Sequence, residues 1–291
     1  LHYFVLIKVN EASYYLFSMY HHIITDGWGT SLMFQRLVKN YNELSESKEV
    51  TTEYPFTYTD FVLDDTQYAA SESYEKDKIY WTEKFKQLPE ELLVPKKNQK
   101  ITPKSDRQTL TIKRETYDLL TQLGKQNGGS TFHVILATLF LYFGQKHQND
   151  EFAIGLPVLN RGKSIFKKTV GLFMGVSPLK IVVNLEENFG ELIKEIKSQL
   201  RLDYRHQRFP LGKIIKELKL YTEKNRLFDI TLSYEKQNYA DHFLNTKTKV
   251  IPLSHQAERV ALALYIREFD NTEDVDEEDK TIVDEKDKNI I

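Results

Sequence analysis

Two adjacent histidines, His21 and His22, stand just ahead of an Asp-Gly pair, Asp26 and Gly27. A histidine side chain has an ordinary pKa of about 6.5, so it can take up a proton near neutral pH. The chain contains no cysteine, which excludes a thiolate nucleophile and a thiolate metal site. We therefore expect a histidine general base at this motif, and no metal site.

A strand before the histidines and a helix after them are predicted to hold this motif. Residues 14–20 are aromatic and apolar over the length of a buried strand, and residues 31–41 repeat apolar side chains at helical spacing. Successive side chains of a strand point to opposite faces, so only one of His21 and His22 can face a given cleft. One histidine is expected to be chemical and the other structural. Asp26, in the turn, can pair with a cation or accept hydrogen bonds from backbone amides.

A lone histidine near a strand end is more often a packed or surface residue than a catalyst, so only the whole motif indicates catalysis. H-H-x-x-x-D-G resembles the motif of nonribosomal peptide synthetase condensation domains, members of the chloramphenicol-acetyltransferase-like superfamily. Further segments resemble elements of that family in the expected order, over roughly residues 1 to 268. They are 58–61 (Y-x-D-F), 80–81 with 88–89 (Y-W…L-P), 154–161 (G-x-P-V-x-x-R), 170–179 (V-G-x-F-x-N-x-x-P-L), 206–211 (H-Q-x-x-P-x) and 225–230, which lacks the proline of its element. The family's usual asparagine is replaced by Gly175 or Val176.

The resemblance implies an α/β chain with the two-lobed chloramphenicol-acetyltransferase-like fold. Each lobe is expected to be a mixed sheet with packed helices, with a cleft or tunnel between the lobes. A Lys- and Pro-marked stretch at 95–104 reads as a linker, so we predict a first lobe over residues 1–105 and a second over 106–291, with an acidic tail after residue 270. Because the chain opens directly on a strand at residues 1–7, the resemblance also implies an N-terminally truncated domain, whose activity by itself is in question.

The chemistry that the resemblance implies is attack of an acceptor amine on a donor thioester, with both substrates carried on phosphopantetheine arms. In that scheme His22 is the catalytic base, and a backbone amide around Gly27 donates to the developing oxyanion. His21 is structural, and Asp26 is expected to form a structural ion pair with Arg161. The domain itself binds no cofactor, because the phosphopantetheine belongs to partner carrier domains upstream and downstream. An adenylation domain of the same synthetase is a further expected partner.

Two other functions remain open from the sequence. A coenzyme A-dependent acyltransferase of the same superfamily would use the same histidine, and a non-catalytic carrier-docking module would retain the fold without turnover. Nucleotide binding has little support, because the glycines at 171–175 match neither G-x-x-x-x-G-K-[ST] nor G-x-G-x-x-G.

The composition indicates a globular protein that binds neither nucleic acid nor membrane. The formal net charge is −2 and 28% of the residues are charged, without the basic stripe that nucleic-acid binding needs. No apolar run reaches the roughly 20 residues of a membrane-spanning helix. We expect a cytoplasmic location.

Of the other histidines, His133 is expected to be structural, and both a structural and a functional role remain open for His206. His133 lies on the most apolar predicted helix, 131–145, which has Ser130 or Thr131 as its cap, and it has no acidic neighbour at helical spacing. For His206, which follows a predicted amphipathic helix over 191–204, a capping or packing role is at least as well supported as a functional one.

Overall fold

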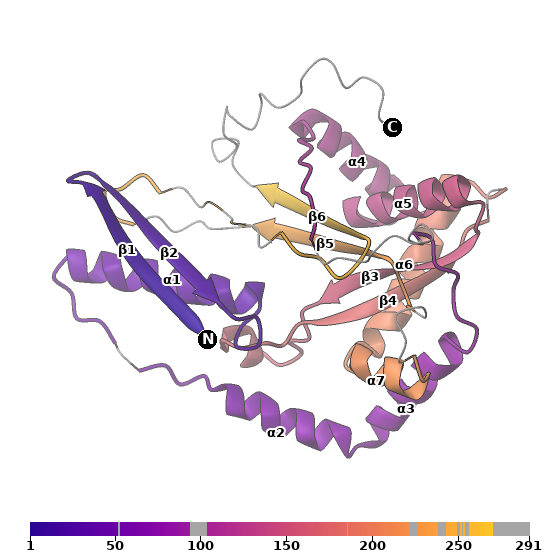
Figure 1. Cartoon of the computed structure of the whole chain (residues 1–291), viewed down its shortest axis with the longest axis horizontal. Coiled ribbons are helices and arrows are strands. Elements are labelled where there is room, and N and C mark those ends of the chain that lie inside the picture. The colour runs from indigo at the N-terminus through magenta and orange to yellow at the C-terminus, as the bar shows by residue number, and fades with distance from the viewer. Residues whose placement is uncertain are drawn as a thin grey trace.

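The computed structural model describes residues 1–51, 53–93, 104–184, 186–220, 226–237, 243–248, 251, 253 and 256–269. The elements are β1 (His2–Asn10), β2 (Ser13–Tyr20), α1 (Gly27–Ser45), α2 (Tyr58–Ala69), α3 (Glu72–Lys84), α4 (Arg114–Gln126), α5 (Thr131–His147), β3 (Glu151–Val158), a short 3-10 helix (Phe166–Lys168), β4 (Gly175–Val182), α6 (Phe189–Arg205), α7 (Leu211–Glu217), β5 (Ile230–Gln237) and β6 (Leu262–Phe269). The ribbon β1–β2 and helix α1 form one part of the molecule, and the other strands form a separate sheet (Figure 1). Helix α2 runs along the lower edge of the view from the first part toward the second. No helix in the described ranges is long and apolar enough to span a membrane.

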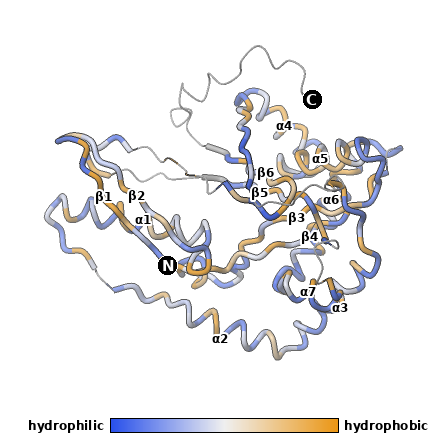
Figure 2. Tube along the Cα trace, viewed as in Figure 1, coloured by the Kyte–Doolittle hydropathy of each residue, from blue (hydrophilic) through white to orange (hydrophobic). Residues whose placement is uncertain are grey.

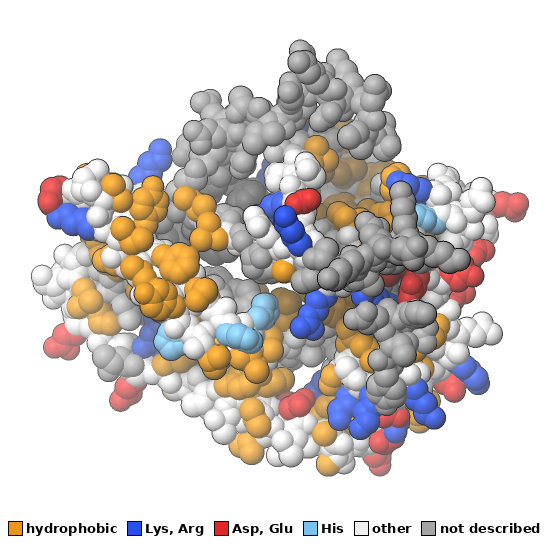
Figure 3. All heavy atoms as spheres, in the orientation of Figure 1, with side chains coloured by type: hydrophobic (Ala, Val, Ile, Leu, Met, Phe, Trp, Pro, Cys, Tyr) orange, Lys and Arg blue, Asp and Glu red, His pale blue; other side chains and the backbone are white. Residues whose placement is uncertain are grey.

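The first part contains an antiparallel ribbon with a largely exposed apolar surface. β1 pairs with β2 from His2 opposite Tyr20 to Asn10 opposite Ser13. We expected a mixed sheet in each lobe, but the sheet described here is a two-stranded antiparallel pair. Apolar side chains gather over the ribbon on the face shown in Figure 3. The large hydrophobic residues exposed on its strands are Tyr3, Phe4, Leu6, Ile7, Val9, Tyr14, Tyr15, Leu16 and Met19.

The second part is organised around a four-stranded sheet of order β4-β3-β5-β6. β3 pairs antiparallel with β4 and parallel with β5, and β5 pairs parallel with β6. The sheet is therefore mixed, as expected for this lobe, and the α/β class is confirmed. Apolar stretches run along these strands, which is typical of a sheet covered on both faces (Figure 2).

Helices cover both faces of this sheet, and the alternation of side chains along β3 shows it. Phe152 and Ile154 point into a core shared with α5 and α6, whereas Ala153 belongs to a second cluster on the other face. That second cluster contains Trp81 at the end of α3 and Ile214 of α7. The core of the molecule thus lies in two layers around β3.

The predicted lobe boundary near residue 105 does not separate two hydrophobic cores, because residues from both sides of it pack together. Trp81 and Phe85, which the sequence placed in the first lobe, are fully buried against Ala153 of β3, and Leu92 joins the core beside α5. Burial of large aromatic side chains dominates such packing, so α3 belongs physically with the second sheet. The predicted linker at 95–104 and the acidic tail lie almost entirely outside the described residues.

Helices α5 and α6 match their predicted positions within a few residues. Ser130 is the N-cap of α5, and its backbone N–H donates to Nδ1 of His133 over 3.1 Å. The hydroxyl of Ser130 lies 2.7 Å from the same nitrogen. Burial, followed by the charge of Lys197, lowers the pKa of His133, which favours the neutral acceptor form. His133 therefore takes the place of the usual glutamate in a capping box, a structural role as expected.

A buried polar network ties α3 to α6. Asp203 Oδ1 accepts from the hydroxyl of Tyr80 over 2.6 Å, from Nζ of Lys84 over 2.5 Å and from Nε2 of Gln199 over 3.0 Å. The side chain of Asp203 is 1% exposed and that of Lys84 is 10% exposed. The pKa of Lys84 lies below its ordinary value because burial lowers it more than the neighbouring Asp203 raises it. This carboxylate needs its cation because a buried charge without a partner is costly.

His206 continues the network and has a structural place in it. The residue caps the C-terminus of α6, and its Nδ1 lies 2.7 Å from Oδ1 of Asp77 on α3. Its ring stacks on Tyr80 at a centroid distance of 4.0 Å. Asp77 Oδ2 also accepts from the hydroxyl of Tyr68 over 2.6 Å. The contacts of His206 are therefore those of capping and packing.

We predict that Lys84→Met lowers the free energy of unfolding by about 3–5 kcal/mol, because it leaves the Asp203 carboxylate buried without its cation. Urea unfolding followed by tryptophan fluorescence measures the change. The matched control is Lys86→Met, which removes an exposed ion pair with Glu83 and should cost at most about 1 kcal/mol. Equal losses in the two variants would contradict the role assigned to Lys84.

Candidate active site

The histidine pair lies in a turn rather than in a strand. β2 ends at Tyr20, and residues 21–24 form the turn that leads to α1. The backbone N–H of His21 donates to the carbonyl of Leu1 over 2.7 Å, which ends the pairing with β1. The expected placement of both histidines in a strand, with alternating side chains, was therefore wrong, and both side chains are exposed.

The two histidines still differ in their local contacts. Nδ1 of His21 accepts from the backbone N–H of Ile23 over 3.1 Å, and this bond helps to shape the turn. His21 was expected to be structural; its side chain is exposed, and the structural contact described for that side chain is this local bond. The side chain of His22 is open to solvent beside the start of α1. Its role as base stays a prediction.

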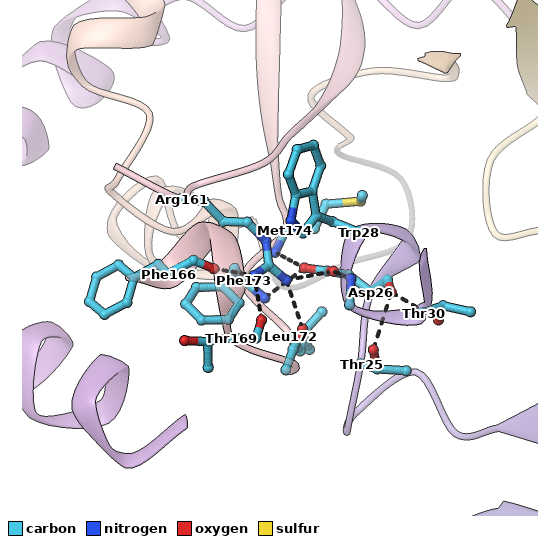
Figure 4. Close-up of polar contacts among 12 residues, drawn as sticks. Thr25, Asp26, Trp28, Thr30, Arg161, Phe166, Thr169, Leu172, Phe173 and Met174 are labelled. Carbon is cyan, nitrogen blue, oxygen red and sulfur yellow. Dashed lines mark hydrogen bonds and ion pairs between the residues drawn. The ribbon is translucent and has the colours of Figure 1, made fainter. Parts of the chain in front are cut away.

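Asp26 is the most heavily bonded group of the motif. Its Oδ1 accepts from the backbone N–H of Gly29 and from Nη2 of Arg161, both over 2.8 Å. Its Oδ2 accepts from the backbone N–H groups of Phe173 over 2.9 Å and Met174 over 3.2 Å. The Gly29 bond makes Asp26 the N-cap of α1. One carboxylate therefore joins the first turn of α1 to the loop between β3 and β4 (Figure 4).

The expected ion pair between Asp26 and Arg161 is present and buried. The side chains are 0% and 2% exposed, respectively. Arg161 also donates through Nη1 to the carbonyls of Phe166 and, over 2.6 Å, Thr169. Its guanidinium lies 4.0 Å from the ring centroid of Phe173. Burial lowers the pKa of Arg161 while Asp26 raises it, and an arginine keeps its charge under these conditions.

The first turn of α1 carries the other candidate groups. The indole N–H of Trp28 donates to the carbonyl of Lys167 over 2.9 Å, which gives a second link to the same loop. Gly27 is exposed, and no atom lies within 4 Å of the position that a Cβ would occupy there. The N–H groups of a helix's first turn have no acceptor within the helix and carry a partial positive charge. Gly27 is thus placed where its amide can face an anion, and its oxyanion role stays a prediction.

Sequence reasoning missed the groups that hold this loop from the other side. The hydroxyl groups of Tyr54 and Tyr58 donate to the carbonyls of Lys168 and Leu172. The loop's contribution to Asp26 comes from backbone amides, which leave no residue-type signal. The signals available were the glycine at 171 and the aromatic motif at 58–61.

The expected tunnel between the lobes is not outlined by the hollow that lies beside this site in the described part of the chain. A hollow of about 680 Å³ lies along α1 and is lined by Arg36, Tyr54 and Lys168, among others, but not by His22. The tunnel therefore remains a prediction. In the described ranges no three His, Asp or Glu side chains are grouped so as to hold a metal ion.

Comparison with known proteins identifies relatives of this chain. Residues 1–277 match the family described as "Condensation domain". The chain is 26% identical over 215 residues to a dimodular nonribosomal peptide synthase of Bacillus subtilis (strain 168), with 74% of this chain and 9% of that protein covered. It is 24% identical over 235 residues to surfactin synthase subunit 1 of the same strain, with 80% of this chain and 6% of that protein covered.

Solved structures show the same fold. The first condensation domain of the CDA synthetase aligns with a TM-score of 0.71 at 20% identity, over 84% of this chain and 54% of that one. The starter condensation domain of rhizomide synthetase, in a mutant form in complex with C8-CoA, aligns with a TM-score of 0.67 at 22% identity, over 81% of this chain and 52% of that one. The chain thus spans less than a tenth of the curated relatives' length and about half of the solved ones.

We predict that Asp26→Ala lowers the free energy of unfolding by about 3–5 kcal/mol, because it leaves the Arg161 guanidinium buried without its anion. Urea unfolding measures this loss. Asp60→Ala, in the exposed first turn of α2, is the matched control and should change stability by less than about 1 kcal/mol. A loss for Asp26→Ala no greater than the control's would contradict a stabilising role for the buried pair.

Proposed function

Because this chain belongs to the condensation-domain family, we propose that it forms the amide bond between two carrier-tethered substrates in nonribosomal peptide synthesis. The donor is an aminoacyl or peptidyl thioester, and the acceptor is an aminoacyl group with a free amine. The reaction is an acyl transfer: the amine nitrogen bonds to the thioester carbon, and the thiol of the donor's arm leaves. No acyl-enzyme intermediate is needed.

The observation that carries this proposal is the buried bond between Asp26 and Arg161 beneath an exposed histidine turn. The pair fixes the start of α1 against the β3–β4 loop. His22 is exposed on this anchored turn, and in the proposal both substrates approach it there. A catalytic group that is already held in position loses little conformational entropy when a reactant binds. Orienting two tethered reactants against such a group can therefore supply much of the rate acceleration.

In the proposed mechanism His22 takes the proton of the attacking amine or stabilises the charge that develops on it. General base catalysis of this kind contributes roughly 10²–10⁴-fold. The backbone amide of Gly27, at the positive end of α1, donates to the oxygen of the tetrahedral intermediate. Asp26 and Arg161 touch neither substrate and act by holding the loop. Phosphopantetheine enters as part of the substrates, attached to the carriers.

The partners in this proposal are carrier domains upstream and downstream and an adenylation domain of the same synthetase. Two relatives that support it are a dimodular nonribosomal peptide synthase and a surfactin synthase subunit. Cytoplasmic location is part of the same proposal.

A second candidate function is acyl transfer from coenzyme A. The observation in its favour is that a structural neighbour, the rhizomide synthetase starter condensation domain, was solved in complex with C8-CoA. The same histidine turn serves both reactions, so only the source of the donor distinguishes them.

We predict that His22→Ala abolishes amide formation in a single-turnover assay with carrier-bound donor and acceptor. The fold should persist, because the exposed side chain of His22 contributes little burial. His2→Ala, which removes another exposed imidazole from β1, is the matched control and should keep the wild-type rate. His21→Ala should cost about 0.5–1.5 kcal/mol of stability, as expected for one lost hydrogen bond. Equal rates for wild type and His22→Ala would refute the catalytic assignment.

We also predict that the protein turns over carrier-tethered donors and acceptors much faster than the same acyl groups on free coenzyme A. Docking of a carrier raises the effective concentration of its tethered group, so that weak contacts to the acyl chain suffice. Initial rates at matched concentrations measure the difference. Equal rates with free coenzyme A thioesters would favour the second candidate function, and carrier binding without product would favour a docking module.

A further inference from the structure

The ring of Tyr58, the first residue of α2, packs directly on the backbone of Gly171. A Cβ at position 171 would lie 2.0 Å from Cδ2 and 2.4 Å from Cε2 of that ring. Real side-chain atoms do not approach so closely, so the packing needs a glycine at this position. The Tyr58 hydroxyl also donates to the carbonyl of Leu172. The start of α2 is therefore fitted to residues 171–172 through both shape and a hydrogen bond.

The other side of Gly171 faces the first turn of α1. A Cβ on Gly29 would lie 3.2 Å from the nitrogen and 3.3 Å from the oxygen of Gly171. The Gly171 carbonyl accepts from the backbone N–H of Asp26 over 3.3 Å and from Nη2 of Arg161 over 3.2 Å. The backbone at 171 is thus enclosed between α1 and the Tyr58 ring.

Helix α2 also packs on Phe173, whose backbone N–H donates to Asp26. The ring of Phe61 lies 4.4 Å from that of Phe173, and the ring of Tyr58 lies 5.3 Å from it, measured between centroids. Arg161 covers Phe173 at 4.0 Å. Position and orientation of the amides at 173 and 174 are therefore determined jointly by α2 and Arg161.

We propose that Tyr58 is a positioning residue for the reaction: it holds the 171–174 backbone whose amides bind Asp26, and through Asp26 it orients the turn that carries His22. The effect on the reaction rests on the proposed function, whereas the effect on the loop does not. Tyr58 acts through the 171–174 backbone and then through Asp26, and in the proposed mechanism it touches no reacting atom. Its loss should therefore lower kcat and leave KM nearly unchanged, because Tyr58 acts on the orientation of the His22 turn and makes no contact with substrate in the proposed mechanism.

Native-state hydrogen exchange tests the loop without reference to activity. In Tyr58→Ala the amides of Phe173 and Met174 should exchange at least tenfold faster than in the wild type, because their contact with Asp26 loosens. Amides in the middle of α5 should be unaffected. Tyr142→Ala, which truncates an exposed tyrosine on α5, is the matched control and should leave 173 and 174 protected. Unchanged exchange at these two amides in Tyr58→Ala would overturn the proposal.

A compensating pair of substitutions tests the ring contact itself. Gly171→Ala introduces a methyl group that overlaps the ring of Tyr58. It should therefore displace the loop and speed hydrogen exchange at the amides of 173 and 174. Adding Tyr58→Ala removes the ring, so the double variant should recover protection relative to Gly171→Ala alone. Tyr58→Phe keeps the ring and loses only the hydroxyl, so it should remain close to the wild type. A double variant with less protection than Gly171→Ala alone would show that the ring is not the constraint.

Single-turnover and steady-state assays with carrier-bound substrates test the link to catalysis. We expect kcat of Tyr58→Ala to fall at least tenfold, with KM within twofold of wild type. Tyr58→Phe, which keeps the ring, should retain most of the wild-type kcat. Faster exchange at 173 and 174 with an unchanged kcat would overturn the positioning role. A wild-type protein that makes no amide would refute the proposed function, and the exchange measurements would then decide the loop contact on their own.

Discussion

The rest of the site depends on one buried carboxylate. Asp26 has no access to solvent, so its charge is stable only if protein groups replace its hydration. Arg161 supplies the opposite charge, and the amides of Gly29, Phe173 and Met174 supply the remaining hydrogen bonds. Because these donors come from α1 and from the β3–β4 loop, the carboxylate can be satisfied only when the two segments meet in one arrangement. The exposed histidine turn takes its position from this requirement.

The mixed sheet provides the frame for that arrangement. Arg161 follows the end of β3, and Gly175 begins β4, so the loop that holds Asp26 leaves and rejoins adjacent antiparallel strands. Helices cover both faces of β3, so the loop starts from a strand that is buried on both sides. Helix α2 then closes the loop from outside. A buried pair of this kind is weak evidence of net stability, and its value here is that it specifies geometry.

The sequence could predict the residues of the site better than their setting. The motif spacing and the resemblance to condensation domains identified Asp26 and Arg161, and their pairing was expected because a buried carboxylate needs a partner. The placement of His21 and His22 in a strand was wrong, since the pairing with β1 ends before them and apolar patterning cannot locate the last hydrogen bond of a ladder. The sequence indicated backbone amides as possible donors to Asp26 but could not identify those at 173 and 174, because every residue type except proline offers a backbone N–H.

What the sequence determined by itself was therefore local and chemical: the α/β class, the positions of α5 and α6, a cap at Ser130 or Thr131, and a motif of two histidines followed by an acidic residue. Periodicity and capping act within a few residues, so they can be read from one segment at a time. Only the tertiary structure decided that α3 packs with the second sheet and that Tyr58 lies against Gly171. These contacts join segments far apart in the chain, and they depend on which surfaces fit together once the core has formed.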